Sequence, residues 1–104
     1  MKEIKAFVHR GRVGDIVHAL EQSGFKRLCV IDVKGLLQAI STREQNYSTE
    51  IGERVTNEIK LEVFCEDEDV EAVVDLISTH GRTGQEIAGW IYQVGVDRAW
   101  PISA

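Results

Sequence analysis

The sequence predicts a small α+β domain in which four strands and two helices follow one another in the order β-α-β-β-α-β. Four short segments have the alternation or the β-branched composition of strands, and two longer ones repeat apolar residues with the period of an amphipathic helix. The 104 residues fit one domain without room for a second core. A hydrophobic content of 43% with 28% charged residues is that of an ordinary globular protein.

The first half of the chain predicts a strand, a helix and a second strand. Residues 3–9 alternate apolar and polar side chains, as a half-buried strand does. Residues 13–24 predict a helix, with Asp15 favouring its N-terminus and Gly24 suited to a left-handed cap after its last turn. Residues 27–33 are short and rich in β-branched side chains, which predicts a strand. The side chains expected to face the core are Ile4, Ala6, Val8, Val13, Ile16, Val17 and Leu20.

The second half predicts a strand, a helix and a strand. Residues 57–66 alternate apolar and polar side chains. Residues 66–79 open with four acids, which favour a helix N-terminus, and continue with an apolar stripe. Residues 89–96 are aromatic and β-branched. The side chains expected to face the core are Ile59, Leu61, Val63, Val70, Val73, Val74 and Ile77. This order of elements is the ferredoxin-like plan, an antiparallel sheet with both helices on one face.

Charge, hydropathy, and the cysteine and histidine positions argue against several classes of function. A net charge of −5 and a pI near 5.1 disfavour nucleic-acid binding, although a small anion site needs only local amides and a few arginines. Neither a membrane span nor a signal peptide is recognisable, so we expect a cytoplasmic protein. Cys29 and Cys65 lie singly in apolar stretches and are expected to be small buried hydrophobes. The scattered histidines predict no metal site.

Two loops exceed what a minimal ferredoxin-like domain needs. Residues 34–56 connect two strands that a hairpin of two to five residues could join. Such a loop is either a disordered insertion or a mobile arm that contacts a partner or closes over a ligand. Residues 80–90, HGRTGQEIAGW, place three glycines between apolar runs. Their backbone amides either wrap a phosphate or serve only to turn the chain.

In their order and spacing, four stretches resemble the PII signal-transduction family, and the resemblance covers almost the whole chain. MKEIKAFV resembles the first strand of the family, and VKG resembles the entry to its long T-loop. EIKLEVF resembles the strand that follows the T-loop, and GRTGQEIAGWIY resembles the B-loop. Residues 34–56 would then be the T-loop and residues 80–90 the B-loop.

The resemblance implies a homotrimer that binds adenine nucleotides in the clefts between subunits and signals to a protein target, such as a transporter or an enzyme, through the T-loop. The nucleotide-binding residues that it implies are Cys29, Lys34, Gly35, Leu36, Leu37, Gln38, Phe64, Arg82, Thr83, Gly84, Gly89, Trp90 and Arg98. The partner-binding residues that it implies in the T-loop are Arg43, Tyr47, Glu50 and Arg54. Trimer formation would cover the second face of the sheet, where we expect Phe7, Val30 and Ile91.

Several positions depart from the family pattern. Gln85, Ile87, Ala88 and Trp90 replace its usual lysine, glycine, aspartate and lysine, and Pro101 and Ser103 replace two phosphate-clamping arginines. Ala39 replaces the glutamine that helps to hold magnesium and 2-oxoglutarate, and Ile51 replaces a modified tyrosine. Because a charged donor contributes about 1.5–3 kcal/mol per contact, we expect AMP or ADP to bind at least as well as ATP, and 2-oxoglutarate to bind poorly.

The same losses favour a divergent member that works in inorganic-carbon metabolism, associated with bicarbonate transport or carboxysomes and responsive to bicarbonate. Two alternatives stay open: a nitrogen-regulatory PII protein that senses ATP and 2-oxoglutarate, and a CutA-like trimer with a metal-linked role. An enzyme is not expected, because the chain lacks a readable Ser-His-Asp or Cys-His pattern. No cofactor is expected beyond the nucleotide effector and a possible bicarbonate ion.

Overall fold

A computed structural model describes residues 1–32 and 58–104 of the chain. The elements follow the predicted order β-α-β-β-α-β, with a short 3-10 turn before each helix. They are β1 (Lys2–His9), η1 (Arg10–Arg12), α1 (Val13–Gln22), β2 (Leu28–Asp32), β3 (Glu58–Cys65), η2 (Asp67–Asp69), α5 (Val70–His80) and β4 (Trp90–Gly95). Each strand and helix lies within one to four residues of the bounds predicted for it.

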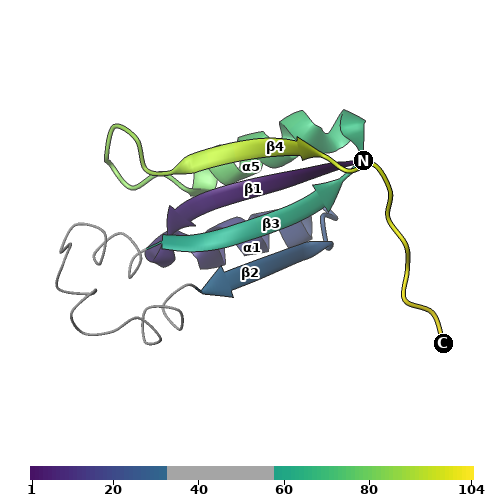
Figure 1. Cartoon of the computed structure of the whole chain (residues 1–104). Helices are drawn as coiled ribbons and strands as arrows, with labels where there is room; N and C mark the ends of the chain where they lie inside the picture. The colour runs from purple at the N-terminus through teal and green to yellow at the C-terminus, as the bar shows by residue number, and fades with distance from the viewer. Residues whose placement is uncertain (33–57) are drawn as a thin grey trace, which may run out of the picture.

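The four strands form one antiparallel sheet in the order β2-β3-β1-β4. Both helices pack on the same face of this sheet, behind it in Figure 1. The other face, called the open face below, carries no helix among the described residues. Gly24 has the left-handed φ of +91° that was expected after the first helix, and its amide donates to the carbonyl oxygen of Glu21. The ferredoxin-like prediction is therefore confirmed.

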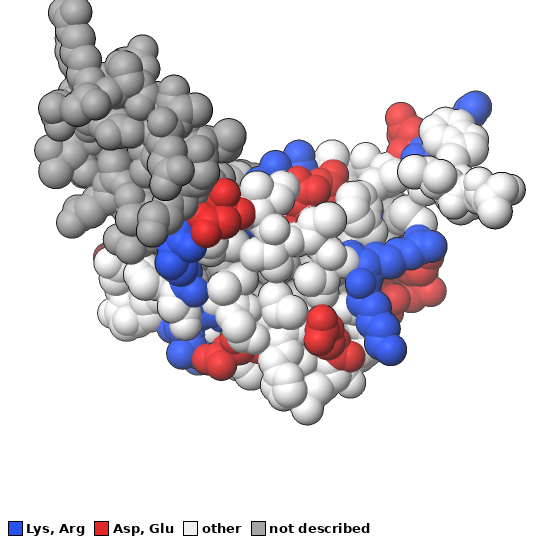
Figure 2. Space-filling view, turned by 90° about the horizontal axis from the view of Figure 1, so that it is seen from below, with Lys and Arg blue, Asp and Glu red and all other residues white. Residues whose placement is uncertain are grey.

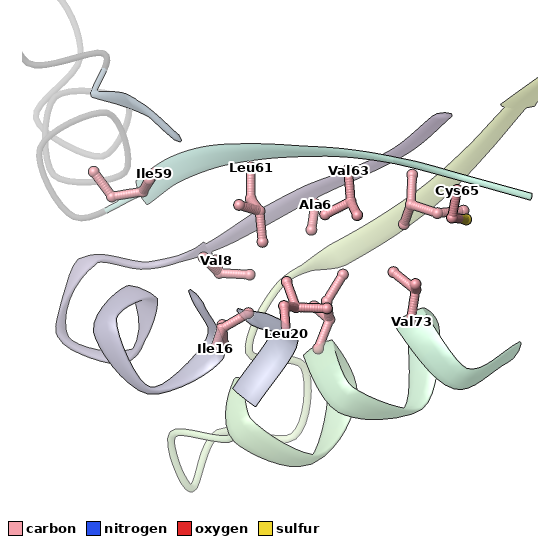
Figure 3. Close-up of a cluster of buried hydrophobic side chains, with 11 residues drawn as sticks. Ala6, Val8, Ile16, Leu20, Ile59, Leu61, Val63, Cys65 and Val73 are labelled. Carbon is pink, nitrogen blue, oxygen red and sulfur yellow. The ribbon is translucent and has the colours of Figure 1, made fainter. Parts of the chain in front are cut away.

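The core lies between the sheet and the two helices (Figure 3). Alternate residues of β1 and β3 point into it, because successive side chains of a strand face opposite sides of the sheet. The buried hydrophobic residues are Ile4, Ala6, Val8, Ile16, Leu20, Ile59, Leu61, Val63, Cys65, Val73 and Ile77. Val13, Val17, Val70 and Val74 are partly buried against this cluster. Every side chain predicted to face the core therefore contributes to it.

The open face differs from its prediction at two residues. Val30 is in register with the buried Leu61, and Ile91 is in register with the buried Ala6. Because paired residues share a face, both belong to the helix-covered side, and only Phe7 lies on the open face as expected. The prediction assigned Val30 and Ile91 to the wrong face of their strands, because neighbouring residues of a strand point to opposite faces of the sheet.

The two cysteines have different environments. Cys65 is buried in the core as predicted, and this burial raises the pKa of its thiol. Cys29 is exposed, which contradicts its prediction as a buried hydrophobe. It pairs with Glu62 on the open face, and β2 is the edge strand of the sheet, so neither a helix nor a further strand of the described chain covers it. No helix within the described residues is both long and apolar enough to cross a bilayer.

Candidate functional site

The loop of residues 80–90, called the glycine loop below, encloses a cavity of about 260 Å³ between α5 and the start of β4. We call it the loop cavity. The loop contributes Ile87 and Ala88, and Trp90, the first residue of β4, also lines the cavity. The complete lining is Phe7, Val8, Ile77, Ser78, Gly81, Arg82, Gln85, Glu86, Ile87, Ala88, Gly89, Trp90 and Ile91. The glycine loop therefore forms a concave surface of mixed character, with apolar side chains beside Ser78, Arg82, Gln85 and Glu86.

The glycines shape this loop for different reasons. A β-carbon at Gly89 would lie 2.1 Å from the carbonyl oxygen of Phe7, so only glycine lets the loop approach β1 this closely. A β-carbon at Gly81 would lie 2.8 Å from the carbonyl oxygen of Ile77, at the end of α5. Gly84 has a φ of +92°, which L side chains rarely adopt. Turning the chain and presenting backbone amides are thus compatible roles of this loop.

A second hollow of about 470 Å³ lies beside the loop cavity and is called the rim hollow. It carries two arginines and a hydroxyl: its lining is His9, Gly11, Arg12, Arg82, Thr83 and Gln85. Arg12 donates to the carbonyl oxygen of His80 at 2.9 Å and lies 3.2 Å from Asp15. Arg82 makes no hydrogen bond or ion pair with another described residue, so its five donors are available to an anion.

A third hollow, of about 510 Å³, lies where the C-terminal segment leaves the sheet and is called the tail cavity. Its lining is Met1, Lys26, Arg27, Leu28, Cys29, Phe64, Val96, Arg98, Ala99 and Trp100. Its walls are held in place by the amide of Val96, which donates to the carbonyl oxygen of Met1 at 3.2 Å, and by the Met1 amine, 2.9 Å from Asp67. The tail cavity therefore combines apolar and aromatic walls with three cations.

The sequence-predicted nucleotide residues fall into two groups within one subunit. Arg82, Gly89 and Trp90 line the loop cavity, with Arg82 and Thr83 also at the rim hollow, while Cys29, Phe64 and Arg98 line the tail cavity. Gly84 lies in the glycine loop, although it lines neither hollow. The two groups therefore lie toward opposite ends of the sheet.

The strand register gives the distance along the sheet between the two groups of predicted nucleotide-binding residues. Trp90 pairs with Phe7, whereas Phe64 pairs with Glu3 on the same strand. Phe7 and Glu3 are four residues apart, which is about 13 Å at roughly 3.3 Å per strand residue. A single subunit therefore does not bring all the predicted residues to one ligand.

Some of the predicted site residues lie outside the described part of the chain, and two basic residues that line a hollow were not predicted. Five of the predicted nucleotide-binding residues and all four predicted partner-binding residues lie outside the described residues. They are Lys34, Gly35, Leu36, Leu37 and Gln38 in the first group, and Arg43, Tyr47, Glu50 and Arg54 in the second. Lys26 and Arg27 line the tail cavity, but their sequence pattern did not mark them as candidates. Their signal was two adjacent basic residues directly before a strand in an acidic protein, a pattern that is not specific on its own.

Charges on the open face are paired and of mixed sign. Lys60 Nζ lies 2.9 Å from Glu62 Oε1, and this hydrogen bond lowers the pKa of Glu62 below its usual value. On the other side of the sheet, where Asp32 is in register with the buried Ile59, Arg10 donates two hydrogen bonds of 2.6 and 2.7 Å to Asp32. Figure 2 views the molecule from below rather than onto the open face, and there too basic and acidic side chains are interspersed. Among the described residues, no group of three or more His, Cys, Asp or Glu could hold a metal ion.

The fold and the hollows define a class: a ferredoxin-like domain whose candidate ligand-binding surfaces lie at loops and chain ends. Comparisons identify the family. The family described as nitrogen regulatory protein P-II matches residues 1–104. Nitrogen regulatory protein P-II 1 of Methanothermobacter thermautotrophicus is 32% identical over 96 residues, covering 92% of this chain and 84% of the relative.

Two further relatives agree with this assignment. Nitrogen regulatory protein P-II 2 of the same organism is 30% identical, over 93% of this chain and 84% of its own. Nitrogen regulatory protein P-II of Pyropia yezoensis is 26% identical, over 94% of this chain and 88% of its own. The chain therefore belongs to the P-II family, the PII signal-transduction family that the sequence resembles. Proteins of this family are regulatory rather than enzymatic.

Proposed function

We propose that this chain is a PII-like regulator that forms a homotrimer, binds adenine nucleotides in the clefts between subunits, and signals to a protein partner through residues 34–56. AMP and ADP bind at least as well as ATP. The observation that carries this proposal is the division of the predicted nucleotide residues between two ends of one sheet. A cleft between two subunits unites the two groups, one from each copy.

The composition of the open face supports association. Trp90, Tyr92 and Val94 are 54%, 51% and 41% exposed, and Phe7 contacts Tyr92 with ring centroids 6.1 Å apart. Large apolar side chains clustered on one exposed surface are typical of a protein interface. The paired charges of β1 and β3 run beside this aromatic cluster, so an interface here includes polar contacts as well.

The cations of the two groups support the ranking of nucleotides. Arg82 lies at the loop end, and Lys26, Arg27 and Arg98 lie at the tail end. The glycine loop itself contains no lysine, and the tail after Arg98 contains no arginine. These cations are enough for one or two phosphates, whereas a triphosphate with magnesium requires denser anchoring.

Co-expression of two variants tests whether the site is shared. Arg82→Ala removes a cation from one side of each cleft, and Arg98→Ala removes one from the other side. Each pure variant trimer is expected to bind ADP more weakly, by roughly 10- to 150-fold. In mixed trimers, about one cleft in four receives both arginines and regains wild-type affinity. If mixing restores no tight sites while both single variants are impaired, the cleft is not shared as proposed.

The finer assignment is to inorganic-carbon metabolism, with bicarbonate as a second effector. Arg82, which has no partner within the described residues, lies beside the Thr83 hydroxyl at the rim hollow, and a planar oxyanion suits an arginine fork. The relatives are named nitrogen regulatory proteins, which keeps ATP and 2-oxoglutarate sensing as the competing function. Calorimetry of ADP with and without millimolar bicarbonate tests this: a changed ADP affinity is expected, and an unchanged one contradicts the carbon assignment.

A further inference from the structure

Three basic side chains converge on the tail cavity. They are Lys26 and Arg27, directly before β2, and Arg98, on the C-terminal segment that passes this end of the sheet (Figure 1). None of the three side chains makes a hydrogen bond or an ion pair with another described residue. Apart from Lys2 and Arg82, every other basic residue in the described part of the chain has an acidic partner. Unpaired positive charge is therefore concentrated at this cavity.

The acidic groups beside this cavity are already paired. Glu62, which is in register with Cys29 of the cavity wall, lies 2.9 Å from the ammonium group of Lys60. Asp67 accepts a hydrogen bond of 2.9 Å from the amine of Met1. The lining that the described residues provide contains no Asp or Glu. The positive charge of the cavity is therefore open to an anionic ligand.

The proposed nucleotide cleft leaves two of these cations without an anion. Between two subunits, Arg82 of one copy and Arg98 of the other are brought to the 5′-phosphates of the nucleotide. The base and the ribose then lie against the apolar wall of the tail cavity, beside Lys26 and Arg27. A neutral base and a ribose offer no negative charge to these two side chains. Like charges in one cavity repel each other, whereas an anion between them accepts charge-assisted hydrogen bonds from both.

We infer that the nucleotide bound by this chain carries a second phosphate on its ribose, and that Lys26 and Arg27 bind this phosphate in the tail cavity. The inference rests on the proposed nucleotide cleft and names the class of its ligand. This class is an adenosine with one phosphate at C5′ and another at C2′ or C3′. AMP and ADP make the first contact and lack the second, so they bind the same cleft more weakly.

The tail cavity has the size and the walls for such a group. Its volume of about 510 Å³ lies within the range of about 300–1,000 Å³ that is usual for ligand sites. Leu28, Phe64 and Trp100 offer apolar contacts to the base and the ribose. The carbonyl oxygen of Arg27 accepts a hydrogen bond of 2.9 Å from the amide of Phe64, which fixes the arginine backbone beside β3. Its guanidinium fork binds phosphate with two parallel hydrogen bonds, and the ammonium group of Lys26 adds a further donor.

Calorimetry of the full chain with four probes tests the inference. The probes are ADP, adenosine 3′,5′-bisphosphate, adenosine 2′,5′-bisphosphate and inorganic pyrophosphate. ADP is the matched control, because it has as many phosphates as the bisphosphates but carries both at C5′. One of the two bisphosphates is expected to bind roughly 10- to 100-fold more tightly than ADP, and pyrophosphate more weakly than either.

The possible failures are distinguishable in the same titrations. Saturable ADP binding with no gain from either bisphosphate overturns the inference and leaves the proposed function standing. If no nucleotide binds, the proposed function fails as well. Pyrophosphate that binds as tightly as the bisphosphates indicates a simple anion site, which also overturns the inference.

Substitutions assign the preference to the two side chains. Lys26→Gln and Arg27→Gln are each expected to reduce the preference for the bisphosphate over ADP by at least about threefold. The double variant is expected to lose this preference while its ADP affinity stays within about threefold of the wild type. Lys2→Gln removes the same single charge outside the tail cavity and is expected to keep the preference. A preference that survives in the double variant overturns the inference.

Phosphorus NMR of the bound bisphosphate gives a readout that a merely structural role of Lys26 and Arg27 would not change. A phosphate monoester loses its second proton near pH 6, and adjacent cations favour the dianion. The ribose phosphate is therefore expected to titrate at a lower pH in the wild-type complex than in free solution, and at the free value in the double variant. If Lys26 and Arg27 instead pair with acids of a neighbouring subunit, the wild-type complex shows no such shift, which overturns the inference.

Discussion

Gly89 lies so close to the carbonyl oxygen of Phe7 that a β-carbon at position 89 would be only 2.1 Å from this oxygen. This contact joins the end of the glycine loop to β1, two residues before the end of that strand. The loop is therefore held by the sheet at one end and by α5 at the other. Its conformation belongs to the fold, whichever ligand it contacts.

Gly89→Ala tests this contact. The added methyl group forces the loop away from β1, and we expect a loss of about 1–3 kcal/mol in the free energy of unfolding, as overpacking usually causes. Urea denaturation measures it. Gly14→Ala in α1 is the matched control, since nothing lies within 4 Å of the position that its added methyl group would take. That change is expected to be neutral or to stabilise by up to about 1 kcal/mol. Equal effects of the two substitutions would contradict the contact.

The pair formed by the Met1 amine and Asp67 predicts a pH dependence of stability. Their hydrogen bond raises the pKa of the amine and lowers the pKa of the carboxyl group. The carboxylate contribution is complete above the unfolded pKa of about 3.9 and is lost as the pH falls through the lower folded value. The amine contribution is complete below about pH 8 and is lost as the pH rises through the higher folded value.

Comparison of Asp67→Asn with the wild type isolates this pair. We expect the difference in unfolding free energy to be constant between about pH 5 and 7 and to shrink at both higher and lower pH. Denaturation at several pH values measures the difference. Glu68→Gln, which removes the same charge at the adjacent position, is expected to lack the alkaline decrease. If both variants behave alike, the effect is one of net charge rather than of the pair.

Cys29 is expected to report on nucleotide binding. It is exposed and lines the tail cavity with Phe64, whereas Cys65 is buried. Maleimide is therefore expected to label Cys29 quickly and Cys65 only after unfolding. Saturating ADP is expected to slow the labelling of Cys29 in the trimer, with Cys29→Ser as the blank. If the labelling rate of Cys29 is unchanged at saturating ADP, the tail cavity is not part of the nucleotide-binding cleft.

Tyr92 tests the open face as the trimer interface. Tyr92→Glu places a charge in the aromatic cluster beside Phe7, and an unpaired charge that must be buried opposes association strongly. Sedimentation is expected to show a monomer with the circular dichroism of a folded chain. His18→Glu, on the outer side of α1, is expected to remain a trimer. Assembly of both variants into trimers would exclude this face as the interface.

The core could be predicted from the sequence because alternation in β1 and β3, and apolar stripes in both helices, fix which side chains turn inward. Strands β2 and β4 were harder to interpret. Both sides of these edge strands carry apolar residues, so Val30 and Ile91 could not be assigned to a face without knowing the register. The exposure of Cys29 was not predicted for the same reason, because the sequence of an edge strand with two apolar faces resembles that of a buried strand.

The division of the candidate site between two ends of the sheet could not be predicted from residue types. Arg82 and Arg98 are 16 positions apart, but β4 runs between them and separates them in space. Lys26 and Arg27 became candidates only when the register placed them beside Phe64, whose amide donates to the carbonyl oxygen of Arg27 at 2.9 Å. Such proximity depends on strand pairing, which local sequence does not encode.

Isothermal titration calorimetry of the trimer with ADP and with MgATP, each with and without 2-oxoglutarate, tests the central claim most directly. We predict saturable ADP binding in the clefts, with a dissociation constant no larger than that for MgATP and no gain from 2-oxoglutarate. Tight MgATP binding that 2-oxoglutarate strengthens would contradict this claim and would make the chain an ATP-sensing and 2-oxoglutarate-sensing PII protein.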